Sequence, residues 1–170
     1  AYVWIVVGIL IGGTAGTIIA KRIEMTALPQ LVAAFHSLVG MAAVLVSFGA
    51  LLAPEAYGIG VVGAIKTSSL VEMSIGLAIG AITFSGSVIA FAKLQGLMSG
   101  KPLVFPGQHA LNALLGITLL VLVIWFCNTE SVSLFLLIAL LSFALGFLLI
   151  LPIGGADMPV VVSMLNSYSG

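Results

Sequence analysis

One histidine, His36, lies within a predominantly apolar stretch from Leu31 to Ala53 that is long enough to cross a bilayer. Ionisable side chains are rare at such positions, and those that occur usually line a proton or ion path or a water-filled cavity. Histidine can take up and return a proton near neutral pH, so His36 is the first candidate for proton transfer. The alternative is a neutral imidazole that hydrogen-bonds a neighbouring helix and serves only packing.

Other polar side chains also interrupt the apolar segments. Those that we single out are Ser37, Glu72, Ser74, Thr83, Ser85, Ser87, Asn166 and Ser167. At 1.5 Å of rise per residue, His36 and Asn166 would each lie about 12 to 14 Å from the start of their helices. Thr83 to Ser87 would lie about 9 to 15 Å from the end of the third span near Lys93. A histidine, an amide and hydroxyls at one level could hold a short water chain. Asp157 would then stand at its cytoplasmic mouth, and Glu72 could collect protons at the outer surface.

Each of these residues also has a purely structural explanation. Serine and threonine in membrane helices usually bond back to a carbonyl of their own helix. Glu72 could simply be interfacial, Asn166 could join two helices, and Asp157 could cap a helix. Their common depth favours a shared path more strongly than any single residue does, although that depth rests on an inferred topology.

The helices that must position these residues follow from composition. Of 170 residues, 62% are hydrophobic and 6% are charged, and the mean hydropathy is +1.36, whereas soluble domains carry about 25% charged residues. Apolar runs of spanning length are Ala1 to Ala20, Leu31 to Ala53, Val71 to Phe91, Leu111 to Cys127 and Val132 to Leu151. We therefore predict an all-α, polytopic transmembrane helix bundle of five full spans plus the start of a sixth at Met158. Because this sixth run stops at Gly170 and the first begins at Ala1, we expect the chain to be a fragment.

Basic residues predict the orientation, because they gather on the cytoplasmic side of short loops. Lys21 and Arg22 follow the first span, and Lys93 and Lys101 follow the third, so alternation puts all four on one face. Lys66 is the exception. We expect this face, with the loop from Pro152 to Asp157, to be cytoplasmic.

Small residues predict where helices pack closely. Gly8, Gly12 and Gly16 recur at four-residue spacing in the first span, and Gly76 and Gly80 do so in the third. Such positions let two backbones approach when lipid offers no hydrophobic contrast.

Other chemistries find no support in the sequence. It contains no G-x-G-x-x-G or Walker A motif for a nucleotide, and Ser85 lacks the preceding glycine of a nucleophile elbow. His36 and His109 share no metal-site spacing, and Asp157 has no second aspartate within the membrane to form a protease dyad. The net charge is zero, which gives no sign of nucleic-acid binding. We predict no catalytic, cofactor-binding or metal-binding residue in this chain.

Four stretches resemble one known family, the proton-translocating NAD(P) transhydrogenase, in the beta-subunit part of its membrane domain. They are Lys21 to Thr26 (KRIEMT), Ala34 to Gly40 (AFHSLVG), Phe84 to Lys93 (FSGSVIAFAK) and Ile153 to Gly170 (IGGADMPVVVSMLNSYSG). The likeness covers nearly the whole chain, with the fourth and fifth spans similar only in hydrophobic character.

The resemblance implies a role for residues 1–170 as a proton-translocating membrane domain. Such enzymes transfer hydride between NADH and NADP+ in separate soluble domains, bind NAD(H) and NADP(H) there, and couple the reaction to proton passage. The family's path residues correspond to His36 and Asn166, and Asp157 corresponds to its aspartate for communication with the NADP(H) domain. Glu72, Thr83, Ser85 and Ser87 are possible secondary path residues.

Further expectations concern the surroundings of the chain. The implied partners are other membrane helices of the same enzyme, its NAD- and NADP-binding domains, the lipid bilayer and a second copy of the assembly. The chain alone would not catalyse hydride transfer. We expect it in a bacterial inner membrane, with a mitochondrial inner membrane as the alternative. The alternative from another class is a fragment of a secondary transporter or ion channel with a gating histidine, whose usual signs are internal repeats or broken helices. A third alternative is a purely structural membrane subunit.

Overall fold

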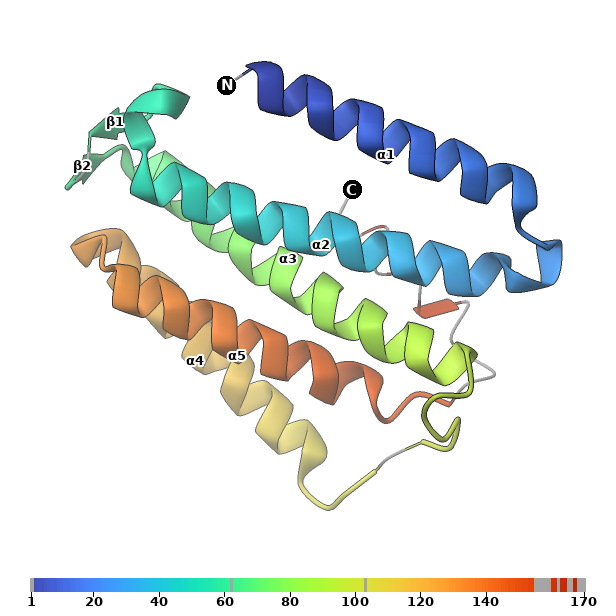
Figure 1. The fold of residues 1–170 in the computed structure, drawn as a ribbon. Coiled ribbons are helices and arrows are strands. Elements are labelled where there is room, and N and C mark those ends of the chain that lie inside the picture. Colours follow the sequence, from blue (N-terminus) through green and yellow to red (C-terminus); the bar gives the residue numbers. More distant parts are fainter. Residues whose placement is uncertain are drawn as a thin grey trace.

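The computed structural model describes residues 2–61, 63–102, 104–154, 160–161, 163–164 and 167. Its long helices in these ranges are α1 (Tyr2–Arg22), α2 (Leu28–Leu52), α3 (Thr67–Leu94), α4 (Gln108–Thr129) and α5 (Val132–Ile150) (Figure 1). All five are long and apolar enough to cross a membrane. The predicted all-α bundle of five spans is therefore confirmed. Of the sixth segment, Val160, Val161, Ser163, Met164 and Ser167 are helical.

Successive helices run in opposite directions, so the bundle has two ends (Figure 1). One end, which we name the Lys93 end, holds the turn between α1 and α2, the loop between α3 and α4, and residues 151–154. The other, the Glu130 end, holds the loop between α2 and α3 and the turn between α4 and α5. Lys21, Arg22, Lys93 and Lys101 all belong to the Lys93 end, as alternation predicts. Pro29 lies in the first turn of α2, where its missing N–H costs no helix bond.

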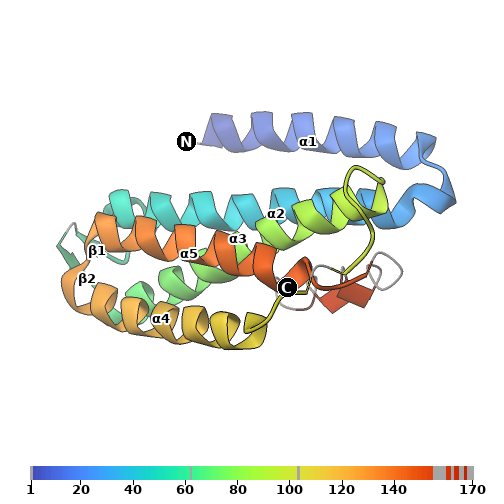
Figure 2. The same ribbon diagram turned by 90° about the horizontal axis from the view of Figure 1, so that it is seen from below.

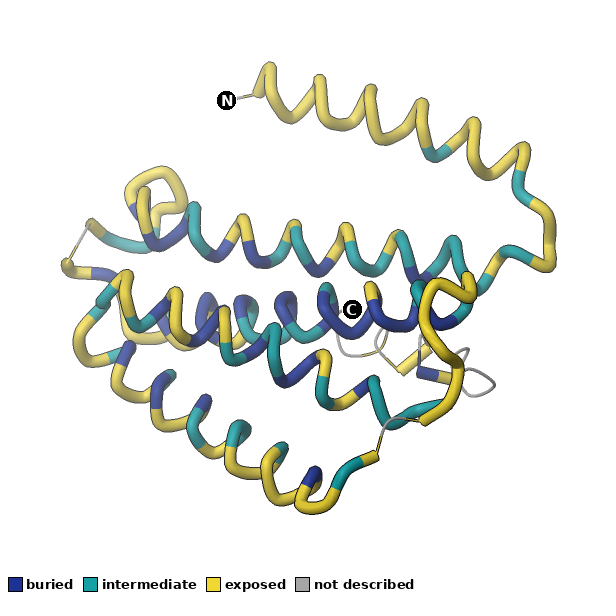
Figure 3. Tube along the Cα trace, turned by 60° about the horizontal axis from the view of Figure 1, so that its bottom comes forward, coloured by how far each residue is buried: buried dark blue, intermediate teal, exposed yellow. Residues whose placement is uncertain are grey.

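The centre of the bundle is α3, which packs against α2 on one side and α5 on the other and carries more buried residues than any other described helix (Figure 3). Glycines allow both contacts. A Cβ atom on Gly80 would lie 2.8 Å from the Gly40 carbonyl oxygen of α2, and one on Gly146 of α5 would lie 2.8 Å from the Ile82 carbonyl oxygen of α3. The predicted packing face of the third span is confirmed at Gly80, with Gly76 in ordinary contact with Ser47.

Helix α1 is different, because it stands apart from the other four (Figures 1 and 2). None of its residues is buried. Among the described residues, nothing lies within 4 Å of a Cβ built on Gly8, Gly12 or Gly16. The packing face that we predicted for this span is thus not used within the described part of the chain. A small-residue stripe allows close approach, but it does not specify the partner.

The loop between α2 and α3 contains structure that the sequence did not lead us to expect. A 3-10 turn (Pro54–Tyr57) precedes two short strands, β1 (Gly60–Val61) and β2 (Ala64–Ile65). The strands pair antiparallel, with Gly60 opposite Ile65 and Val61 opposite Ala64. The Ile65 N–H then donates to Glu130 Oε1 at 3.1 Å, which joins this loop to the turn between α4 and α5.

Candidate functional site

His36 lies on α2 and is half-buried. Its Nδ1 is 2.7 Å from the carbonyl oxygen of Val32, one turn earlier in the same helix. A carbonyl oxygen only accepts, so this contact is a hydrogen bond when Nδ1 carries the proton. In the neutral ring the proton-accepting nitrogen is then Nε2. In that tautomer the helix backbone fixes the orientation of the ring.

The depth of His36 in the bundle follows from the crossing of α2 and α3. A Cβ on Gly40 would lie 2.6 Å from the backbone nitrogen of Phe84. His36 is one turn from Gly40 toward the Lys93 end, and because the helices are antiparallel (Figure 1), it is level with the turn of α3 that follows Phe84. That turn contains Ser85 and Ser87. The structure thus places His36 and the α3 hydroxyls at a similar level.

The three hydroxyl residues of α3 near this level, Thr83, Ser85 and Ser87, are all buried, but they differ in their hydrogen bonds. Ser85 Oγ donates to the Ala81 carbonyl oxygen at 2.9 Å and packs against Gly146, which agrees with the structural explanation of an intramembrane serine. Thr83 Oγ1 and Ser87 Oγ have no hydrogen-bond partner within the described ranges. They are four residues apart and so share one face of α3.

Unpartnered hydroxyls in an apolar interior are costly, and ordered water commonly satisfies such groups. Thr83 also lines a cavity of about 270 Å³ with Ile79, Ile82 and Leu149. A further buried hydroxyl without a partner among the described residues belongs to Ser142 of α5. The sequence analysis did not single out Ser142, since only the packing of α5 on α3 shows that it is fully enclosed.

Not every predicted residue joins this group. Glu72 is exposed in the second turn of α3, eleven residues from Thr83 and hence about 16 Å away along the helix. Asn166 and Asp157, predicted as a path residue and a coupling residue, lie outside the described residues. Val161 shows that the last segment approaches the site, because it packs with Ala33, Ile89, Ala90 and Ile150.

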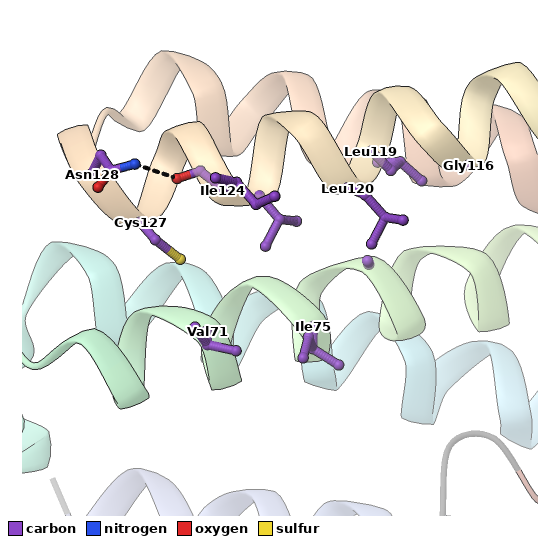
Figure 4. Close-up of a pocket in the computed structure, with 10 residues that line it drawn as sticks. Val71, Ile75, Gly116, Leu119, Leu120, Ile124, Cys127 and Asn128 are labelled. Carbon is purple, nitrogen blue, oxygen red and sulfur yellow. Dashed lines mark hydrogen bonds between the residues drawn. The ribbon is translucent and has the colours of Figure 1, made fainter.

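A second and larger cavity, of about 590 Å³, lies between α3 and α4 (Figure 4). Its lining is apolar except for Cys127 and Asn128, and the Asn128 side-chain amide donates to the Ile124 carbonyl oxygen at 3.1 Å. Helices α3 and α4 pack loosely along it, with Gly116 exposing backbone on the α4 side. This groove offers hydrocarbon surface and no chain of polar groups, so it does not suit proton transfer.

Lys93 corrects a sequence-based expectation. Its charge suggested a position in the loop after the third span, but it lies in the last turn of α3 and is only 6% exposed. Its Nζ donates to the carbonyl oxygens of Leu151 and Ile153, at 2.6 and 2.7 Å. The sequence shows that Lys93 is charged. Only the fold shows that the carbonyl oxygens just past the end of α5 lie beside it and accept its hydrogen bonds.

Comparison with known proteins decides the family. The model described as "NAD(P) transhydrogenase beta subunit" matches residues 1–170. The chain belongs to this family. The NAD(P) transhydrogenase subunit beta of Rhodospirillum rubrum is 72% identical over 170 residues, which is 100% of this chain and 37% of the relative. A relative of the same name from a defined strain of that organism matches to the same extent. This chain therefore spans little more than a third of the relatives' length.

The family assignment confirms the resemblance first indicated by the four sequence stretches. It also covers the fourth and fifth spans, which the resemblance matched only in hydrophobic character. With five helices suited to crossing a bilayer, this transhydrogenase beta-subunit chain is an integral membrane protein. His36, Ser85 and Ser87 thus occur at a similar level of a transhydrogenase membrane region, with Thr83 about one turn away on α3.

Proposed function

We propose that this chain is the proton-translocating membrane part of an NAD(P) transhydrogenase. The observation that carries the proposal is the position of His36, whose Nδ1 is held by the Val32 carbonyl. It lies level with Ser87 and about one helical turn from Thr83, two residues whose hydroxyls have no hydrogen-bond partner among the described residues. Held in this way, the ring can exchange a proton at Nε2, and water bound by the hydroxyls can carry that proton onward. Asn166 and Asp157 complete the proposal, as a path residue and as the link to the NADP(H) domain. Glu72, at the other end of α3, would collect protons at the outer surface.

Coupling follows from linkage. Protonated and neutral His36 must favour different arrangements of the Lys93 end, because a ligand shifts an equilibrium only by its differential affinity for the two states. By reciprocity, NADP(H) bound in a separate domain must change the proton affinity of His36. In this scheme hydride passes between NADH and NADP+ in soluble domains, and the chain itself holds no nucleotide. The complete assembly would be a dimer in a bacterial inner membrane.

The test compares the full-length enzyme and its His36→Leu variant in sealed vesicles, with nucleotide-driven proton movement and hydride transfer measured together. His109→Leu is the matched control, because His109 is the exposed histidine at the start of α4. We expect His36→Leu to abolish proton movement and the hydride transfer coupled to it, and His109→Leu to resemble the parent. Normal pumping by His36→Leu would reduce His36 to a packing residue. Absence of nucleotide-driven pumping in the parent would contradict the proposed function itself.

A further inference from the structure

The Lys93 end contains a buried cation that the proposed proton path does not use. The Lys93 ammonium group donates to the carbonyl oxygens of Leu151 and Ile153, although Lys93 belongs to α3 and both acceptors lie just past the end of α5. The last carbonyls of a helix have no partner within that helix. They also carry the negative end of the helix dipole, so a cation is favoured there. Lys93 therefore caps a helix to which it does not belong.

A second hydrogen bond ties α2 to the same place. The Gln30 side-chain amide donates to the Leu94 carbonyl oxygen at 3.4 Å. Leu94 directly follows Lys93, so the end of α3 is held on one side by α2 and on the other by α5. Gln30 is six residues before His36, about 9 Å along the same helix. We name this set of contacts, formed by Gln30, Lys93, Leu94, Leu151 and Ile153, the end bracket.

Apolar packing surrounds the end bracket. Ala33 of α2 and Ala90 of α3 are fully buried. They belong to one apolar cluster, together with Ile89, Ile150 and Val161. Alanine side chains have no rotamers to change, so a shift of α2 at Ala33 must be transmitted or resisted by the backbones around it. Val161 brings the last described segment into the same cluster. Both the polar and the apolar contacts thus connect α2 to the chain on either side of residues 155–159.

We propose that Lys93 is a positioning residue that couples the His36-bearing helix to the segment containing Asp157. This inference rests on the proposed function. A displacement of α2 moves the end of α3 through the hydrogen bond between Gln30 and Leu94. The end of α3 in turn moves the backbone just past α5 through the two hydrogen bonds that Lys93 donates. Ile153 is four residues before Asp157. Lys93 acts on the position of this backbone and takes no part in proton transfer.

The experiment measures protons moved per hydride transferred by the full-length enzyme in sealed vesicles. Lys93→Met keeps the length and apolar stem of the side chain but removes its three donors, whereas Lys93→Arg keeps charge and donors. Lys66→Met is the matched control, because Lys66 is an exposed lysine at the opposite end of the same helix. A ratio is used because loss of folded enzyme lowers both rates together and leaves their quotient unchanged.

We expect Lys93→Met to lower this ratio about fivefold or more, the lower limit of typical coupling between sites. Lys93→Arg should restore at least half of the parent ratio, and Lys66→Met should leave it unaltered. If Lys93→Met fails to insert, Lys93→Gln, which retains an amide donor, replaces it with the same expected direction. A parent-like ratio in the inserted Met or Gln variant would overturn the role of Lys93 while leaving the proposed function intact. A parent enzyme without nucleotide-driven pumping would instead overturn the proposed function.

Discussion

Gly40 of α2 and Gly80 of α3 meet backbone to backbone where the two helices cross. A Cβ on Gly40 would lie 2.6 Å from the Gly80 carbonyl oxygen, and a Cβ on Gly80 would lie 2.8 Å from the Gly40 carbonyl oxygen. Neither backbone can yield as a flexible side chain would. This crossing sets the depth of His36 relative to the hydroxyls of α3, so the glycines determine the geometry of the candidate site without contributing a functional group.

Gly40→Ala is therefore expected to separate α2 from α3. Overpacking of this kind typically costs about 1 to 3 kcal/mol of stability, and it should lower proton movement as well by shifting His36. The stability change is measured by unfolding in detergent. Gly8→Ala on α1, where nothing lies within 4 Å among the described residues, is the control and should be neutral. Equal stability of the two variants would contradict the close crossing.

The hydroxyls of α3 should separate into two functional classes. Thr83→Val combined with Ser87→Ala removes the two unpartnered hydroxyls, so we expect slower proton movement with little loss of stability. Ser85→Ala removes a hydroxyl already bonded to its own helix, so proton movement should be retained. The measurement is nucleotide-driven acidification or alkalinisation of vesicles at matched protein insertion. Slower proton movement in Ser85→Ala alone would reverse our assignment of the water-binding face.

Glu130 should contribute to stability through its hydrogen bond with the Ile65 N–H. Glu130→Ala leaves that donor without its acceptor, which typically costs about 1 to 3 kcal/mol for a buried group. Glu130→Gln keeps an acceptor oxygen at the same place and should cost less. The backbone at this position is left-handed, with φ of 51°. Alanine and glutamine both carry a Cβ atom there, so comparing them isolates the effect of the side-chain oxygen. Unfolding in detergent would detect it, and identical values for Ala and Gln would argue against the bond.

Phe135 anchors the core near the Glu130 end. It is fully buried, with its ring 4.9 Å from that of Phe48 at 84° and 4.9 Å from that of Phe126. Truncation of a buried aromatic residue to alanine typically costs about 3 to 5 kcal/mol. We expect Phe135→Ala to lower the unfolding free energy by such an amount, and Leu136→Ala, on the exposed face of the same helix, to change it little. A small effect of Phe135→Ala would show that this end packs less tightly than described.

Much of the fold was predictable because a bilayer admits few backbone arrangements. Every backbone polar group in the hydrocarbon must be paired internally, so a long apolar run becomes a helix. Lys21, Arg22, Lys93 and Lys101 then belong to one end of the bundle, as alternation of the spans requires. The level of His36 relative to Ser85 and Ser87 was also predictable, because it depends only on helix rise and direction.

What escaped prediction depends on which helices are neighbours. Lys93 was expected in a loop because a lone charge near a span end usually reaches water. Its burial depends on the carbonyl oxygens of Leu151 and Ile153, which lie beside it just past the end of α5. Local sequence periodicity does not say which helices are neighbours in space. Ser142 was overlooked for the same reason. The glycines of α1 show the converse, since a pattern suited to contact is present but no contact occurs among the described residues.

The hydrogen bonds at Glu130 and Lys93 also have a mechanical consequence when they are considered together. Glu130, just before α5, holds Ile65, just before α3, and Lys93, at the end of α3, holds Leu151, just past α5. The parallel helices α3 and α5 are thus hydrogen-bonded to each other's ends at both sides of the bundle. Gly146 packs against α3 between these two hydrogen bonds. Neither helix of this pair can slide along the other without breaking both hydrogen bonds. A displacement of either helix along its axis should therefore carry the other with it, from one end of the bundle to the other.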